Sequence, residues 1–137
     1  MTNYRVLHIS DSFPGLHASF GGAEVIAKRL VELFHTAGWQ QGVVVTRPDN
    51  PKAEIPGVKL FFSKTIEDLL PEENWITALK GQLLPYDPLA SRTLFNTLND
   101  FKPQVVFLHT IRRFSLYTAE ICKRMGVPVF LMVYDYI

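Results

Sequence analysis

The sequence predicts an α/β protein: a doubly wound parallel sheet with helices on both faces, in three α/β/α layers. Two observations favour this fold class. Short apolar runs alternate with segments of helical periodicity along most of the 137 residues. The clearest run, GVVVT at residues 42–46, is continuous and β-branched, as is typical of a strand that is buried on both faces. The length corresponds to one domain, residues 1–137.

The expected strands and helices follow one another in regular alternation. The strands are predicted at residues 4–9, 42–46, 58–62, 104–109 and 128–134. The first helix begins after Gly21-Gly22 and ends at Gly38, and its predicted apolar face consists of Ala23, Ile26, Ala27, Leu30, Leu33, Phe34 and Ala37. A second helix begins at Asp87-Pro88 and ends at Lys102-Pro103, because Asp is a good N-cap and Pro suits the first helical position. A third is expected over residues 114–125.

Residues 63–87 interrupt this alternation. A helical turn is predicted over 65–70, and a broken helix that carries Trp75 over 74–84. The segment either shapes a ligand site or forms a packed side lobe.

Composition narrows the function classes. A net charge of +1 with 20% charged residues gives no electrostatic reason to expect nucleic acid as a partner. The 47% of hydrophobic residues is typical of a packed domain, and Cys122 is expected to be a buried small hydrophobe. We see neither a signal peptide nor an apolar run long enough for a bilayer span, so the expected location is the cytoplasm, with peripheral contact at the inner face of a membrane as an alternative.

The loop between the first strand and the first helix, SDSFPGLHASFGGAE at residues 10–24, is too long for a simple turn. Gly21 and Gly22 stand where the helix begins, so a phosphate oxygen can approach the backbone N–H groups without meeting a Cβ. Glu24 lies in the first turn, where a carboxylate interacts well with the unpaired N–H groups. The alternative is that the glycines only let the helix pack closely on the sheet. His17 lies in the same loop, which we expect to be mobile.

Three stretches are predicted to meet at one rim of the sheet. With a strand order of 3-2-1-4-5, ligands bind outside the carboxyl ends of the strands, at the point where the order reverses. The glycine loop, His109-Thr110 and Tyr134-Asp135-Tyr136 all lie at this rim. Each has a structural alternative: His109 and Tyr134 as core residues, and Asp135 as a helix cap. His8, inside the first strand, is interpreted as core or sheet-edge packing, and Arg112-Arg113 as an anion contact or a solvated face.

Several other chemistries are disfavoured. The loop is not G-x-G-x-x-G, and no acidic residue ends the second strand, so a nicotinamide oxidoreductase is the least favoured function. The sequence contains no Walker A motif, no G-x-S-x-G and no H-E-x-x-H. The D-x-D motif of metal-dependent sugar transfer is absent as well, and we expect no metal site.

Three motifs resemble the retaining glycosyltransferases of the GT-B fold, the large group-one or family-four set. The first is the strand, Gly-Gly-x-Glu loop, helix and valine-rich strand of residues 6–46. The others are YDPLASRTLFNTLNDFKPQVVFLHT at 86–110 and GVPVFLMVYDY at 126–136. The resemblance covers nearly the whole chain apart from about residues 63–84.

The resemblance implies that the chain is the N-terminal, Rossmann-like half of such an enzyme, the domain that holds the acceptor. Gly21, Gly22 and Glu24 would lie at the diphosphate of a nucleotide-sugar donor such as a UDP- or GDP-sugar. His109, Tyr134 and Asp135 would line the reaction centre. The family transfers the sugar with retention and without a bound metal or other cofactor, to a saccharide or lipid-linked acceptor.

Two features limit what this chain would do by itself. It stops just past a strand, so we expect a longer parent whose C-terminal domain binds the nucleotide-sugar, and we expect the 137 residues alone to transfer no sugar. Tyr134 stands where the family often has His, while Gln104 and Phe107 replace a frequent Asp and His. Tyr134 favours the alternative function, a non-catalytic Rossmann-like binding or scaffold module.

Overall fold

A parallel sheet is the frame of the molecule. The computed structural model describes residues 4–18, 20–65, 68, 87–110, 114 and 117–132. Within these residues the sheet has five strands: β1 (Arg5–Ile9), β2 (Gln40–Thr46), β3 (Val58–Ser63), β4 (Val105–Leu108) and β5 (Val129–Leu131). They lie in the order β3-β2-β1-β4-β5, and every neighbouring pair is parallel. The predicted strand order is confirmed.

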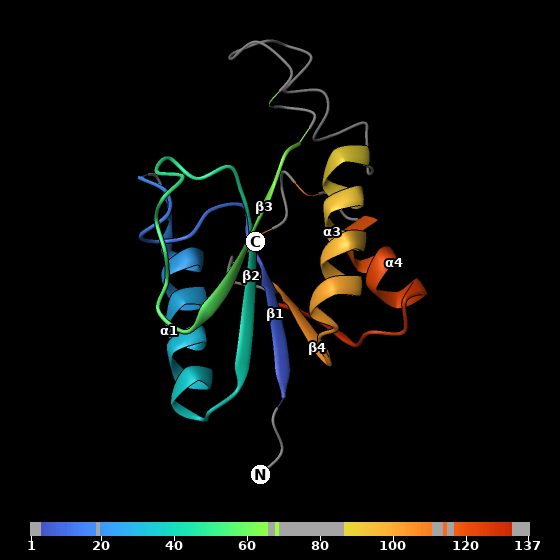
Figure 1. Ribbon diagram of the computed structural model, residues 1–137, viewed down its shortest axis with the longest axis horizontal. Helices are drawn as coiled ribbons and strands as arrows, with labels where there is room; N and C mark the ends of the chain where they lie inside the picture. Colours follow the sequence, from blue (N-terminus) through green and yellow to red (C-terminus); the bar gives the residue numbers. More distant parts are fainter. Residues whose placement is uncertain are drawn as a thin grey trace.

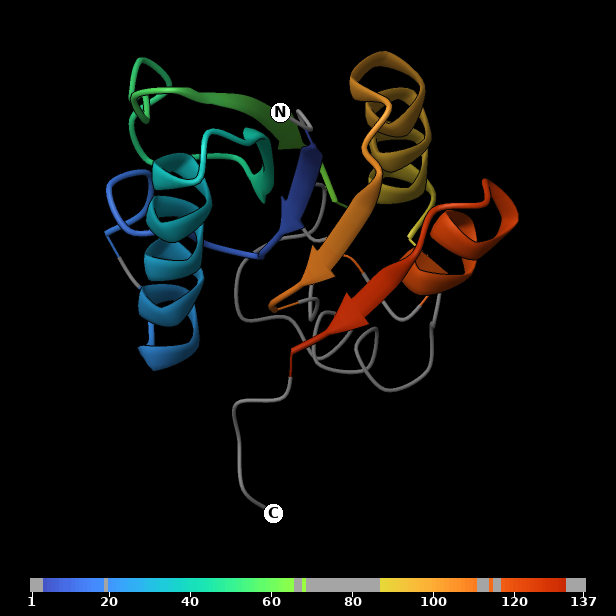
Figure 2. The same ribbon diagram turned by 90° about the horizontal axis from the view of Figure 1, so that it is seen from below.

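Helices cover both faces of the sheet. Helix α1 (Gly22–Thr36) lies on one face, and α3 (Pro88–Phe101) and α4 (Tyr117–Arg124) lie on the other (Figures 1 and 2). The fold is therefore Rossmann-like, with the three α/β/α layers predicted. No helix in the described part of the chain is long and apolar enough to cross a membrane.

The start and end of α3 follow the predicted capping residues. The buried Asp87 is the N-cap, and its Oδ1 accepts hydrogen bonds from the backbone N–H groups of Leu89 at 3.0 Å and Ala90 at 3.1 Å. The helix ends at Lys102, which adopts φ +51° and donates its N–H to the carbonyl of Leu98. Local sequence thus decides both ends of this helix.

The predicted apolar face of α1 is partly wrong. Its buried residues are Ala27 and Val31, whereas Ile26 and Leu33 are 47% and 63% exposed. The line of contact with the sheet follows the i, i+4 spacing from Ala27 to Val31, and Phe34 extends it one turn further while remaining half-buried. The helix presents a narrower face to the sheet than its apolar residues predict.

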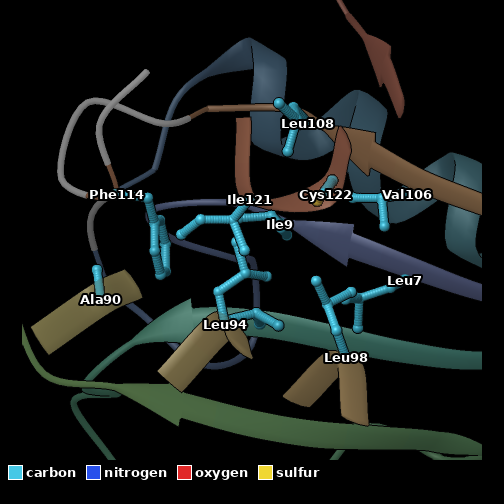
Figure 3. Close-up of a cluster of buried hydrophobic side chains, with 11 residues drawn as sticks. Leu7, Ile9, Ala90, Leu94, Leu98, Val106, Leu108, Phe114, Ile121 and Cys122 are labelled. Carbon is cyan, nitrogen blue, oxygen red and sulfur yellow. The ribbon is translucent and has the colours of Figure 1, made fainter. Parts of the chain in front are cut away.

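Two cores fill the spaces between the layers. On the α1 side, residues of β2 pack with Ala27 and Val31 and with two loop residues, Phe13 and Leu16. The larger core lies between the sheet and α3 and α4 (Figure 3) and contains Leu7, Ile9, Val44, Ala90, Leu94, Leu98, Val106, Leu108, Phe114, Ile121 and Cys122. The prediction for Cys122 is confirmed: its side chain is buried, and burial raises the pKa of the thiol to about 11.

Some element boundaries differ from the prediction. Strand β2 begins at Gln40, α4 begins at Tyr117, and Phe114 lies in a turn. Strand β5 begins after Pro128, whose ring nitrogen has no hydrogen to donate to a ladder. Of the turn predicted over 65–70, Thr65 and Asp68 are described, and Asp68 donates its N–H to the Thr65 carbonyl. The helix predicted over 74–84 lies outside the described residues.

Candidate ligand-binding rim

The carboxyl ends of β1 and β4 hold the loop 10–21 and His109 next to each other. The N–H of His109 donates to the carbonyl of Ile9 at 2.9 Å, and the N–H of Asp11 donates to the carbonyl of Thr110 at 3.0 Å. These two bonds extend the β1–β4 ladder beyond both strands. Two of the three predicted stretches therefore meet at the rim, where the strand order reverses (Figure 2).

Hydroxyl groups join the loop to the end of β4. The buried Ser10 Oγ donates to the Ser12 carbonyl at 2.7 Å and lies 2.9 Å from Thr110 Oγ1. The Ser12 carbonyl can only accept, so the single hydroxyl hydrogen of Ser10 is used in that bond. Thr110 must therefore donate its hydroxyl hydrogen to Ser10. Thr110 Oγ1 in turn accepts the N–H of Asp11 at 3.0 Å. Each of these polar groups is satisfied inside the rim.

The rest of the loop is tied to the body of the protein, contrary to the expectation of mobility. Phe13 and Leu16 are buried in the core under α1, so the loop contributes its own apolar anchors. The backbone N–H of Phe13 donates to His17 Nδ1 at 3.0 Å, and Thr46 Oγ1 donates to the carbonyl of Asp11 at 2.6 Å. His17 therefore stabilises the loop instead of standing free at the site.

The two glycines at the start of α1 are not required by packing. Gly21, the N-cap, is exposed with φ −111°, and Gly22 is likewise exposed and without positive φ. Among the described residues, a Cβ built on Gly22 meets no atom within 4 Å, and one on Gly21 meets only Glu24 Oε2, at 3.3 Å. The alternative that these glycines let the helix pack closely on the sheet is therefore wrong. What Gly22 provides is open space at its Cβ position, beside the first backbone N–H groups of the helix.

Glu24 already places a negative charge at this helix N-terminus. Its Oε2 accepts the N–H of Gly21 at 2.9 Å, the reciprocal half of a capping box, and its Oε1 accepts from Ser12 Oγ at 3.3 Å. The carboxylate thus links the helix to the loop that carries Ser10 and Ser12. A phosphate that approaches Gly21 must take the place of this carboxylate at the amide.

His109 is buried at the rim and belongs to a chain of polar groups that the sequence did not predict. The residue is 4% exposed, and its ring stacks on that of His8, with the centroids 5.2 Å apart. His109 Nε2 lies 3.0 Å from His8 Nδ1, and His8 Nε2 lies 2.9 Å from Gln41 Oε1. Gln41 Nε2 donates to the backbone carbonyl of Val31 in α1 at 2.6 Å. His8 is in the core, as predicted, and it is also the hydrogen-bond partner of a candidate site residue.

Burial keeps both imidazoles neutral at pH 7. Desolvation lowers the pKa of His8 to about 4, although its hydrogen bond to Gln41 acts in the opposite direction. The pKa of His109 falls to about 3, first because of burial and then because of the adjacent His8. A neutral ring cannot offer a full positive charge to an anion. The groups at this rim that suit an anion by their chemistry are the backbone amides at the start of α1.

The other predicted site residues stay predictions. Tyr134 and Asp135, and also Arg112 and Arg113, lie outside the described residues. A hollow of about 640 Å³ lies elsewhere, lined by residues 51–60 and Phe62. Its lining residues belong to the connection from β2 to β3 and to β3 itself. We base the site on the rim because convergent polar groups and helix amides are found there.

No protein-family model matches the chain, and no curated protein matches it at a significant level.

Proposed function

We propose that this chain is the acceptor-side, Rossmann-like domain of a retaining glycosyltransferase of the GT-B fold. One observation carries the proposal: the exposed glycine pair at the start of α1, which neither packing nor backbone conformation requires. It is held beside the carboxyl end of β1 by Ser12 and Glu24. The proposed ligand of the glycine amides is the diphosphate of a nucleotide-sugar donor.

The amides of Gly21 and Gly22 suit a diphosphate for two reasons. The first N–H groups of a helix have no partner within the helix, and the helix dipole favours negative charge there. The Glu24 carboxylate competes with the phosphate only at the Gly21 N–H. When a phosphate oxygen binds there, the carboxylate keeps its bond to Ser12 or becomes hydrated. Preorganised amides at the leaving diphosphate would stabilise the charge that develops as the sugar departs.

The acceptor would lie on the other side of the same rim. The proposed contact is His109, which is fixed at the end of β4 by its backbone bond to Ile9. Strand β5 neighbours β4 with Leu131 opposite Leu108, so the carboxyl ends of the two strands lie at the same edge of the sheet. Tyr134 and Asp135 are the proposed contributions from that strand. Transfer itself, with retention and without a bound metal, is proposed only for a protein in which this domain is paired with a nucleotide-sugar-binding domain.

Calorimetric titration with UDP, GDP and their sugar conjugates tests the proposal. We expect weak binding to the wild-type chain, on the order of millimolar, because half a cleft provides only part of the contacts. Gly22→Val places a branched side chain in front of the amides and should weaken binding at least tenfold. Ala37→Val adds similar bulk at the exposed far end of α1 and is the matched control. Equal affinity of the two variants, or no binding of any nucleotide by the wild type, would contradict the proposal.

A further inference from the structure

A tight turn in the loop after β1 is closed by the side chain of His17. The turn has Pro14 and Gly15 at its centre, and Gly15 adopts φ +92°, as a type II turn requires. The Leu16 N–H donates to the Phe13 carbonyl across the turn at 3.0 Å. The imidazole of His17 returns to the start of the turn, where its Nδ1 accepts the Phe13 N–H at 3.0 Å. Both backbone polar groups of Phe13 are therefore bonded within the loop.

The other ring nitrogen of His17 faces the carboxyl end of β2. Its Nε2 lies 3.2 Å from the Arg47 carbonyl oxygen and 3.4 Å from Thr46 Oγ1. The carbonyl can only accept a hydrogen bond. Thr46 donates its one hydroxyl hydrogen to the carbonyl of Asp11 at 2.6 Å, so toward His17 it can only accept as well. Because two acceptors face Nε2, this nitrogen must carry a proton.

These contacts require a neutral ring. A backbone N–H can only donate, so Nδ1 of His17 must offer a lone pair to Phe13 while Nε2 donates to Arg47. This is the neutral imidazole with its proton on Nε2. An imidazolium carries protons on both nitrogens, so its Nδ1–H would face the Phe13 N–H, and two donors would stand 3.0 Å apart. Uptake of a proton by His17 therefore breaks the bond to Phe13.

Charged groups of both signs lie on the elements that surround His17. Among the described residues they are Asp11 of its own loop, Arg47 and Asp49 after β2, and Glu24 and Lys28 of α1. Two of the carboxylates are hydrogen-bonded to backbone N–H groups of the same loop, Asp49 to Ala18 and Glu24 to Gly21. Because the charges are mixed in sign, the contact that a proton on His17 disturbs most directly is the donor at Phe13.

We propose that His17 is a pH-sensitive positioning residue of the rim: the neutral ring holds the loop on the end of β2, and the protonated ring releases the Phe13 N–H. Phe13 directly follows Ser12, whose Oγ donates to Glu24 Oε1 at 3.3 Å. Glu24 in turn accepts the Gly21 N–H at the start of α1 at 2.9 Å. Release at Phe13 therefore disturbs the groups that hold the loop to the start of α1. That these amides bind a diphosphate rests on the proposed function, whereas the protonation response of the loop does not.

NMR of the ligand-free chain tests the response directly. In long-range ¹H–¹⁵N spectra at pH 8, we expect His17 to show a protonated Nε2 and an unprotonated Nδ1. As the pH is lowered to 5.5, the amide shift of Phe13 should change with the same midpoint as the His17 ring. The protection of this amide against hydrogen exchange should fall about tenfold, as expected for one lost hydrogen bond. A neutral His17 with its proton on Nδ1, or a Phe13 amide that does not follow the ring, would overturn the proposal.

A pair of matched variants separates the proton from the contact. His17→Asn places Oδ1 near the position of Nδ1, so it still accepts the Phe13 N–H but takes up no proton, and the Phe13 amide should no longer respond to pH. His35→Asn makes the same change at an exposed histidine in the last turn of α1 and should leave the response unaltered. The other two histidines, His8 and His109, stay neutral in this range because burial lowers their pKa values to about 4 and about 3.

Either of two results would overturn the role of His17: a Phe13 amide that still responds to pH in folded His17→Asn, or one that loses its response in His35→Asn. Because no nucleotide is present, these outcomes are independent of the calorimetric test of function.

Discussion

His8 and His109 are stacked imidazoles that the folded chain holds in their neutral forms. Their pKa values are lowered from the ordinary 6.5 to about 4 and about 3, chiefly by burial. In the unfolded chain both rings take up a proton as the pH falls through 6.5, whereas in the folded chain they do not until pH 4 or below. The unfolded state therefore binds more protons in this window, and acid favours unfolding.

We predict that the free energy of unfolding is fully retained above pH 6.5 and declines between pH 6.5 and 4. Each histidine contributes a slope of up to about 1.4 kcal/mol per pH unit, or about 2.7 for the pair. Urea denaturation at pH 7.0, 6.0 and 5.0 measures the slope. His8→Phe retains an aromatic ring between Phe34 and Phe107 but removes one titrating group, so its slope should be lower by up to about 1.4 kcal/mol per pH unit. Equal slopes for the two proteins would contradict this explanation.

At the scale of elements, α1 begins at a glycine N-cap that has no side chain of its own. The carboxylate of Glu24 takes over its function, accepting the Gly21 N–H and the hydroxyl hydrogen of Ser12. We predict that Glu24→Ala lowers the free energy of unfolding by about 1 kcal/mol, since it removes a capping interaction and a favourable charge at the helix N-terminus.

Glu32→Ala is the control for this prediction. Glu32 lies on the same helix and is exposed, but it lies toward the C-terminal end, where a negative charge is not favoured by the dipole. Its replacement should change stability by less than about 0.5 kcal/mol. Equal losses in the two variants, measured by urea denaturation, would show that the Glu24 bonds do not stabilise the helix start.

The elements were predictable where short-range chemistry decides them. Asp87-Pro88 predicts the start of α3 because the cap bonds involve residues two and three positions further on. Gly38 predicts the end of α1 because its φ of +81° suits glycine. The extent of the buried face of α1 was not predictable in the same way. Ile26 and Leu33 are as apolar as their neighbours, and only the position of the sheet leaves them exposed.

At the scale of the whole molecule, the strand order was predictable. The series of hydrogen-bonded side chains His109, His8 and Gln41 was not. Alternating strands and helices favour a few parallel topologies, and the observed order is one of them. In contrast, the link between His8 and His109 joins residues 101 positions apart, and the link from His8 to Gln41 spans 33. These contacts depend on strand register and on which face each side chain occupies.

One signal in the sequence pointed toward this series of hydrogen-bonded side chains. His8 interrupts an apolar strand, and a polar side chain buried there requires a partner. It occupies the face opposite Leu7 and Ile9, so candidates lie on the same face of neighbouring strands or of the helix above them. The register pairs His8 with Val43 and Phe107, and Gln41 and His109 each lie two positions from one of these partners. Without the strand register, nothing in the sequence identifies Gln41 and His109 as the partners of His8.

The central claim is that the rim at the carboxyl ends of β1 and β4 binds a nucleotide diphosphate at the start of α1. The most direct measurement is a map of backbone amide NMR shifts during titration with UDP. We predict that the largest changes occur at Gly21 and Gly22 and extend to Ser12, whose bond to Glu24 is disturbed when a phosphate replaces the carboxylate. Changes confined to the hollow beside β3, at residues 51–60, or no changes at millimolar UDP would contradict the claim.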